Sequence, residues 1–309
     1  MSIKYKRPLV VVNPNSAGGK TGKNYAQSLK ILEESTLFEK IDVFKSLSKE
    51  STIEKVVEVH NGGNDYDMLI SLGGDGSIST ICNGLMNVDL KKRLPILPLP
   101  SGTGNSLLLD FHVKNIYDAL NNFKKNEIKL LDVLLMEEIN GNFKWHCINL
   151  IGLGFISDVV LHTVNKFNSF GAIKYMLGTF CALKEFKPYK TKILYNGKKE
   201  VFETDKAYFI TVSNSKYSGG NIKVAPDALY DDGLLDIMIL HDLGRLKYLR
   251  GFMRAFSGKH VHEKECKYFK AKDVEVYLEP GSLLMPDGEL EGTSPINVKV
   301  LPREIKILL

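Results

Sequence analysis

Three glycine-rich turns are the segments of this chain whose residue types could do chemistry. They are Asn13 to Gly19, Gly73 to Ser77 and Pro100 to Asn105, and each one follows a short apolar run and precedes a helix-like segment. Glycines let backbone N–H groups approach an anion closely, and a helix N-terminus adds partial positive charge. Because the carboxyl ends of strands in a doubly wound sheet line one crevice, three such turns predict a common phosphate-bearing ligand.

The first two turns differ in what they could bind. Gly19-Lys20-Thr21 is similar to the end of a Walker loop, but that pattern needs a glycine five residues earlier, where Pro14 stands, so we reject it. The second turn places Asp75 among exposed amides, where a carboxylate holds phosphate poorly unless a cation intervenes. Asp75 therefore indicates a nucleotide bound together with Mg²⁺.

The first 130 or so residues alternate short apolar runs with helix-period segments. This alternation is typical of βαβ units and predicts a mostly parallel sheet that is covered on both faces. The expected strands are residues 9–12, 41–44, 68–72 and 95–99, and the expected helices are residues 24–33, 52–60 and 79–86.

The second half of the chain has a different pattern. Asn140-Gly141 and Asn196-Gly197 each separate two strand-like runs and predict tight hairpin turns, so this half reads as antiparallel. Apolar stripes predict two helices within it, near residues 172–186 and 243–256. The second of these helices is rich in Arg and Lys, which we interpret as a solvated face in preference to a membrane-docking patch.

Composition excludes several classes of protein. The chain has 309 residues with 41 Lys plus Arg against 36 Asp plus Glu, and this small excess is no nucleic-acid signature. Four distant cysteines and seven histidines show no zinc or disulfide spacing. No apolar run approaches the roughly 20 residues of a membrane-spanning helix, and no secretion signal is evident. We expect a cytoplasmic protein whose membrane contact, if any, is peripheral; the oligomeric state is left open, a homodimer included.

The three turns resemble the motifs of the diacylglycerol kinase catalytic-domain family, which also contains the sphingosine and ceramide kinases and bacterial soluble lipid kinases. The resemblance continues downstream in the Ala225 to Asp236 block and in Asp287-Gly288-Glu289, so it runs essentially end to end. It implies an α/β protein of two domains. The first is a Rossmann-like parallel nucleotide domain similar to those of NAD kinase and 6-phosphofructokinase, at residues 1–130 with returning strands at 292–309. The second is an antiparallel β-sandwich at residues 131–291 that holds the lipid.

The resemblance also implies the roles of individual residues. Asp287 would be the base that deprotonates a lipid hydroxyl, with Glu289 as its alternative, and Asp75 would orient a catalytic Mg²⁺. A separate structural metal would bind at Leu229, Asp232 and Leu234. The remaining residues would contact ATP: Asn13, Pro14, Asn15, Ser16, Ala17, Gly18, Ser46, Gly73, Gly74, Asp75, Gly76, Ser77, Thr80, Gly102, Thr103 and Asn105.

The chain departs from the family pattern at three positions. Ser79 and Thr80 stand where the family resembles Asn-Glu, and Ser106 stands where many bacterial members have Asp.

The predicted activity is transfer of the γ-phosphate of ATP, with Mg²⁺, to the hydroxyl of a diacylglycerol-type or sphingoid-type lipid at a membrane surface. Two alternatives remain open. One is a NAD or sugar kinase, because these enzymes share the Gly-Gly-Asp-Gly loop; the other is a catalytically weak nucleotide- or lipid-binding regulator.

Overall fold

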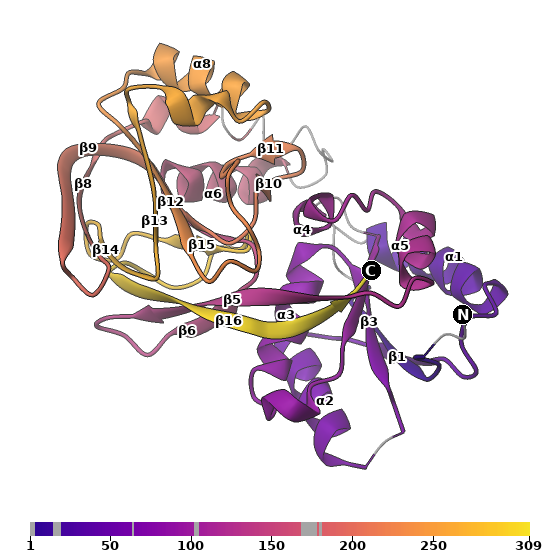
Figure 1. The fold of residues 1–309 in the computed structure, drawn as a ribbon. Helices are drawn as coiled ribbons and strands as arrows, with labels where there is room; N and C mark the ends of the chain where they lie inside the picture. The colour runs from indigo at the N-terminus through magenta and orange to yellow at the C-terminus, as the bar shows by residue number, and fades with distance from the viewer. Residues whose placement is uncertain (1–3, 15–19, 64, 102–104, 168–177, 179–180) are drawn as a thin grey trace. The chain divides into compact units, whose positions relative to one another are not determined.

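The computed structural model describes residues 4–14, 20–63, 65–101, 105–167, 178 and 181–309 (Figure 1). The chain divides into two compact units. Unit 1 comprises Met1–Leu131 and Arg303–Leu309, and unit 2 comprises Asp132–Pro302. Two long strands, β5 (Ile128–Glu138) and β16 (Ile296–Leu308), contribute residues to both units.

Unit 1 is built on a parallel sheet. Its strands are β1 (Pro8–Val12), β2 (Asp42–Lys45), β3 (Met68–Gly73) and β4 (Ile96–Pro100), in the order β2-β1-β3-β4. The end of β16 adds a further parallel strand, with Ile307 opposite Ile96. All residues of β1 and β3 are buried, as expected for strands covered on both faces. The four predicted strands and the parallel sheet are confirmed.

The helices of unit 1 are α1 (Lys20–Glu34), α2 (Lys49–Asn61), α3 (Asp75–Leu85), α4 (Ser106–Asp110) and α5 (Ile116–Phe123). The three predicted helices correspond to α1, α2 and α3. The sequence analysis missed α5, whose eight residues give a short periodic signal. Its start is nevertheless encoded locally, because the Asn115 side chain accepts a hydrogen bond from the Asp118 N–H at 3.0 Å.

Unit 2 is an antiparallel β-structure. Its hairpins pair β5 with β6 and β8 with β9, at the two Asn-Gly turns that predicted them. The long strand β9 pairs with β8 through its first half and with β7 through its second, while β12 lies on its other side. The strands are β6 (Lys144–Cys147), β7 (Leu150–Gly154), β8 (Tyr189–Tyr195), β9 (Glu200–Ser213), β10 (Tyr217–Ser218), β11 (Ile222–Lys223), β12 (Leu235–His241), β13 (Cys266–Ala271), β14 (Asp273–Tyr277) and β15 (Leu284–Pro286).

Two long helices, α6 (Phe155–Phe167) and α8 (Arg245–Ala255), lie over one side of this β-structure (Figure 1). The predicted helix at residues 243–256 is confirmed as α8. Most of the predicted helix at residues 172–186 lies outside the described residues. The analysis missed α6, because Ile156, Val159 and Val160 are β-branched residues with low helix propensity and continue the apolar run of β7. Among the described residues, no helix combines the length and apolarity needed to cross a membrane.

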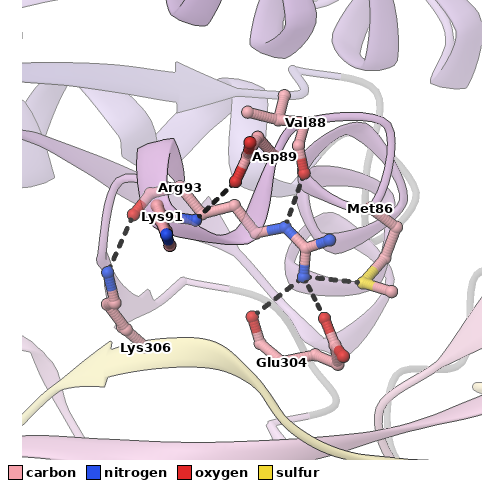
Figure 2. Close-up of polar contacts among 7 residues, drawn as sticks. All are labelled: Met86, Val88, Asp89, Lys91, Arg93, Glu304 and Lys306. Carbon is pink, nitrogen blue, oxygen red and sulfur yellow. Dashed lines mark hydrogen bonds and ion pairs between the residues drawn. The ribbon is translucent and has the colours of Figure 1, made fainter.

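A buried arginine fixes the end of β16 within unit 1 (Figure 2). Arg93 is 8% exposed; its Nε donates to the Val88 carbonyl at 2.9 Å and its Nη1 to the Glu304 carbonyl at 3.1 Å. The same guanidinium pairs with the Glu304 carboxylate, and Lys306 Nζ donates to the Arg93 carbonyl at 3.4 Å. A charge as buried as this guanidinium is tolerated only when it is paired and hydrogen-bonded.

We therefore expect Arg93→Met to destabilise unit 1 by about 3 kcal/mol, because it leaves the partly buried Glu304 carboxylate without its partner. Urea unfolding followed by circular dichroism measures the change. Lys92→Met is the matched control, since the neighbouring Lys92 is exposed. Equal stability of the two variants would contradict a structural role for this pair.

Candidate active site

In unit 1, the second and third glycine-rich turns are joined through Asp75. This residue begins α3 directly after β3, and its carboxylate accepts the backbone N–H of Ser106 at 2.7 Å and of Leu107 at 3.1 Å. The Ser101 N–H also donates to the Gly73 carbonyl at 3.1 Å. Asp75 thus holds the first turn of α4 against the start of α3. This contact between Asp75 and the start of α4 was not predicted from the sequence, because residues 75 and 106 come together only in the fold.

The two turns leave polar groups available for a ligand. Among the described residues, which leave out 102–104, the buried Ser101 hydroxyl has no hydrogen-bond partner. A side chain at Gly73 would stand 2.1 Å from the Ser77 hydroxyl, so only glycine fits beneath that residue. Gly74, Gly76 and Ser77 are all partly exposed here, and Asn105 occupies the N-cap position of α4 without a capping hydrogen bond from its side chain. Asn13 and Pro14 follow β1, whereas Asn15, Ser16, Ala17, Gly18, Gly102 and Thr103 lie outside the described residues.

Two predicted nucleotide contacts point into the protein instead. Ser46 is 1% exposed, and its hydroxyl donates to the Ser48 carbonyl at 2.8 Å and lies 2.5 Å from the Thr52 hydroxyl. Thr80 is 6% exposed and donates to the Gly76 carbonyl at 2.8 Å within α3. Both hydroxyls bond to groups of the protein itself, so their contact with a nucleotide stays a prediction and carries no part of our proposal.

In unit 2, Asp287 occupies a tight turn after β15. Both Asp287 and Gly288 have positive φ angles, 48° and 94°, and the Glu289 N–H donates to the Pro286 carbonyl at 3.0 Å. The Asp287 carboxylate accepts three backbone N–H groups, from Ile148 at 3.0 Å, Asn149 at 2.8 Å and Leu150 at 3.3 Å. These donors fix the side chain and stabilise its charged form. Glu289 is exposed beside it.

A buried polar network supports this carboxylate, and its members Asn149, Asn214 and Ser215 were not predicted from the sequence. The Asn149 side chain accepts from the Ser215 hydroxyl at 2.7 Å, and the Asn214 amide donates to the carbonyls of Asp132 at 2.8 Å and Ile148 at 3.0 Å. Asp132 is fully buried and accepts the Gly233 N–H at 2.7 Å. The one available signal was the polar run Ser213-Asn214-Ser215 at the end of an apolar strand.

At the predicted structural metal site, the ammonium group of Lys270 lies beside the Asp232 carboxylate. Asp232 accepts the Leu234 N–H at 3.0 Å, and its other oxygen lies 2.8 Å from Lys270 Nζ. Lys270 also lies 3.2 Å from Asp236, and the Leu229 side chain is exposed. The Lys270 ammonium offsets part of the charge of these two carboxylates, and the metal at Leu229, Asp232 and Leu234 stays a prediction.

Asp75 fits a Mg²⁺ ion that is bound together with the nucleotide better than Asp232 fits a structural metal ion. The carboxylate oxygens of Asp75 accept the N–H groups of Ser106 and Leu107, and carboxylate oxygens are ligands that Mg²⁺ prefers. Among the described residues, no cluster of three or more acidic, His or Cys side chains forms a metal cage. Mg²⁺ typically binds proteins through one or two carboxylates together with substrate phosphates, so Asp75 suffices as the protein ligand.

An apolar cavity of about 120 Å³ lies within unit 2 between α6, α8 and the sheet. Its walls include Val160 of α6, Leu240 of β12 and Phe252 of α8, and Gly288 of the Asp287 turn also lines it. Burial raises the pKa of the Tyr248 phenol and lowers the pKa of the His260 imidazole, so both of these lining residues are uncharged at neutral pH. The cavity therefore offers an uncharged binding space beside the turn that carries Asp287.

Comparison with known proteins identifies the two parts of the chain. The diacylglycerol kinase catalytic domain matches residues 7–136, and the YegS C-terminal NAD kinase beta sandwich-like domain matches residues 151–309. The chain belongs to the diacylglycerol kinase catalytic-domain family. It is accordingly a kinase, and the predicted fold class, a parallel α/β domain followed by a β-sandwich, is confirmed.

Relatives of this family member extend over its whole length. A diacylglycerol kinase from Bacillus subtilis is 26% identical over 98% of this chain and 96% of its own length. A diacylglycerol kinase from Staphylococcus aureus is 28% identical over 98% of this chain and 92% of its own length. The crystal structure of a diacylglycerol kinase from Bacillus anthracis covers 99% of this chain and 97% of its own length with a TM-score of 0.70; at 22% identity it shows the shared fold.

For this kinase we expect Asp75→Ala to release the start of α4, because the N–H groups of Ser106 and Leu107 lose their acceptor. Loss of such a cap costs about 1–2 kcal/mol, which corresponds to roughly tenfold faster exchange of these two amides. Hydrogen exchange measured residue by residue tests this, with Asp75→Asn retaining one acceptor and giving an intermediate rate. Unchanged exchange in Asp75→Ala would refute the capping role.

Proposed function

We propose that this protein transfers the γ-phosphoryl group of ATP, bound with Mg²⁺, to the free hydroxyl of diacylglycerol. The observation that carries the proposal is the apolar cavity that reaches the Asp287–Gly288 turn, which suits an acceptor with a hydroxyl beside an apolar chain. Apolar cavities on the order of 150 Å³ bind benzene-sized groups, so this one suits a short stretch of an acyl chain. The full-length relatives named diacylglycerol kinases support this acceptor.

In this proposal the two aspartates have separate tasks. Asp287 accepts the proton of the acceptor hydroxyl; the freed oxygen forms a bond to the γ-phosphorus as the bond to the ADP oxygen breaks. The three N–H groups keep the carboxylate ionised and oriented before the reaction. Asp75 binds Mg²⁺, which neutralises the phosphate charge when bound. The Ser101 hydroxyl and the glycine-rich backbone of both turns bind phosphate oxygens.

Labelled γ-phosphate transfer tests the proposal. The purified protein is incubated with labelled ATP and Mg²⁺ and with detergent micelles that contain diacylglycerol or sphingosine, and NAD serves as the soluble acceptor. Label in phosphatidic acid supports the proposal. Label in NAD alone would assign the protein to the NAD kinases, and absence of label from every acceptor would favour the regulator. The expected cytoplasmic location stays a prediction.

Asp287→Asn is expected to reduce turnover about 10²–10⁴-fold, because the amide can neither accept the proton nor pair with three N–H donors. Steady-state kinetics with saturating ATP measure the effect, and Glu279→Gln is the control because Glu279 is exposed elsewhere in unit 2. Near-normal turnover in Asp287→Asn together with loss in Glu289→Gln would transfer the role of the base to Glu289.

Gly251 permits a direct test of the cavity. It lines the cavity in the middle of α8, and a Cβ added there meets no atom within 4 Å. Gly251→Leu should fill the space and lower kcat/KM for long-chain diacylglycerol roughly tenfold. Because glycine weakens helices, both Gly251→Leu and the control Gly251→Ala should gain about 0.5–1 kcal/mol of stability. Equal kcat/KM values in the two variants would place the acceptor elsewhere.

A further inference from the structure

Helix α8 has two chemically different faces. On the inner face, Tyr248 and Ala255 are buried, and the Tyr248 ring packs edge-on against Phe155 of α6 with centroids 5.0 Å apart. On the outer face, Leu246 is 83% exposed and Met253 is 68% exposed. These two residues are seven positions apart, so they lie one above the other along the helix. Single exposed apolar residues are common, but an aligned pair on one helix forms a stripe.

The same outer face is positively charged. Helix α8 has four basic residues and no acidic one. Lys247 pairs with Glu265 at 2.6 Å and Arg254 with Glu263 at 2.9 Å, so these two charges are satisfied locally. Arg245 donates to the Lys184 carbonyl at 3.2 Å, and Arg250 lies between Leu246 and Met253 on the outer face. Within the described part of the chain, neither Arg245 nor Arg250 forms an ion pair with a carboxylate.

Further positively charged residues follow the end of α8. Phe256 at its end is 46% exposed, and Lys259 and Lys264 follow as exposed residues. Neither lysine forms an ion pair with a described carboxylate. We define the α8 face as the exposed residues Arg245, Leu246, Arg250, Met253, Phe256, Lys259 and Lys264.

In place of the solvated face interpreted from the sequence, we propose that the α8 face docks on the surface of an anionic phospholipid bilayer. An interfacial helix places apolar side chains at the boundary of headgroups and acyl chains while its cations contact lipid phosphates. The α8 face supplies both in one place, with Leu246 and Met253 along its centre and the cations Arg245, Arg250, Lys259 and Lys264 beside them. An acidic protein surface would satisfy the cations but would leave the apolar stripe in contact with charged groups.

The position of the cavity agrees with this arrangement. Gly251 and Phe252 of α8 line it from the opposite side of the helix, so docking would bring the cavity close to the lipid phase. This deepens the proposed function and rests on it for the identity of the substrate, since diacylglycerol resides in the bilayer. The docking itself is measured without turnover.

The test uses the full-length protein and floating vesicles. One set is pure phosphatidylcholine and the other contains about 30 mol% phosphatidylglycerol, both at about 0.1 M salt, where charge attraction to the anionic surface is only partly screened. We expect binding to the anionic vesicles and weak binding to the neutral ones. Raising the salt to about 0.5 M should release most of the protein.

Variants separate the two components of docking. Leu246→Asn combined with Met253→Gln should weaken vesicle binding at least tenfold, because it removes the apolar stripe. Arg245→Gln combined with Arg250→Gln should weaken it about 30-fold, at roughly fivefold for each cation. Val201→Thr and Lys192→Gln are the matched controls, since both residues are exposed on the β8–β9 hairpin toward its Asn196-Gly197 turn. Unfolding midpoints should stay unchanged in all four variants.

The vesicle-binding measurements test the docking proposal independently of the kinase activity. Equal binding of the α8 variants and the controls, or equal binding of the unaltered protein to neutral and anionic vesicles, overturns docking through this face. Turnover of dioctanoylglycerol in non-ionic micelles is measured in parallel and should be the same in the α8 variants as in the unaltered protein. Vesicle binding without any such turnover would overturn the proposed function and leave the docking intact.

Discussion

Backbone N–H groups that need hydrogen-bond acceptors determine the local structure around Asp75 in unit 1 and around Asp287 in unit 2. Turns that leave a sheet end expose N–H groups which the sheet itself cannot pair, and buried donors without acceptors cost free energy. Asp75 accepts two of them at the start of α4, and Asp287 accepts three before β7. Each carboxylate is thereby fixed in place, and each turn depends on its aspartate. The chemical roles proposed for these two aspartates therefore fall on residues that also have structural roles, so loss of activity in a variant requires a structural measurement beside it.

Residues close together in the sequence made much of this fold predictable. Buried apolar runs predicted the strands of unit 1, and the Asn196-Gly197 turn predicted the β8–β9 hairpin, because both signals are local. The family motifs indicated Asp75 and Asp287, but they did not reveal that the partners of Asp75 are the amides of residues 106 and 107. Such contacts between distant residues form only when the strands are in register, and one sequence carries no direct record of them.

The burial of side chains explains the other differences between what the sequence predicted and what the structure shows. Ser46 follows β2 and Thr80 lies within α3, and the hydroxyls of both bond to nearby groups in the protein. Local sequence does not distinguish a hydroxyl that faces a ligand from one that stabilises a helix start. In α6, packing on the sheet outweighs the weak helix propensity of Ile156, Val159 and Val160, so propensity alone failed there.

The chemistry of a lipid acceptor places opposite demands on unit 2. A hydroxyl needs a charged base, which water and polar neighbours stabilise, whereas an acyl chain needs an apolar space without charge. The structure meets the first demand with N–H groups donated to Asp287 and the second with a cavity whose Tyr248 and His260 are uncharged. Gly288 lines the cavity and directly follows Asp287, so the two environments meet within one dipeptide. In the proposed reaction, an acyl chain in the cavity would lie next to Asp287, and the φ angle of 94° at Gly288 is one that glycine adopts without strain.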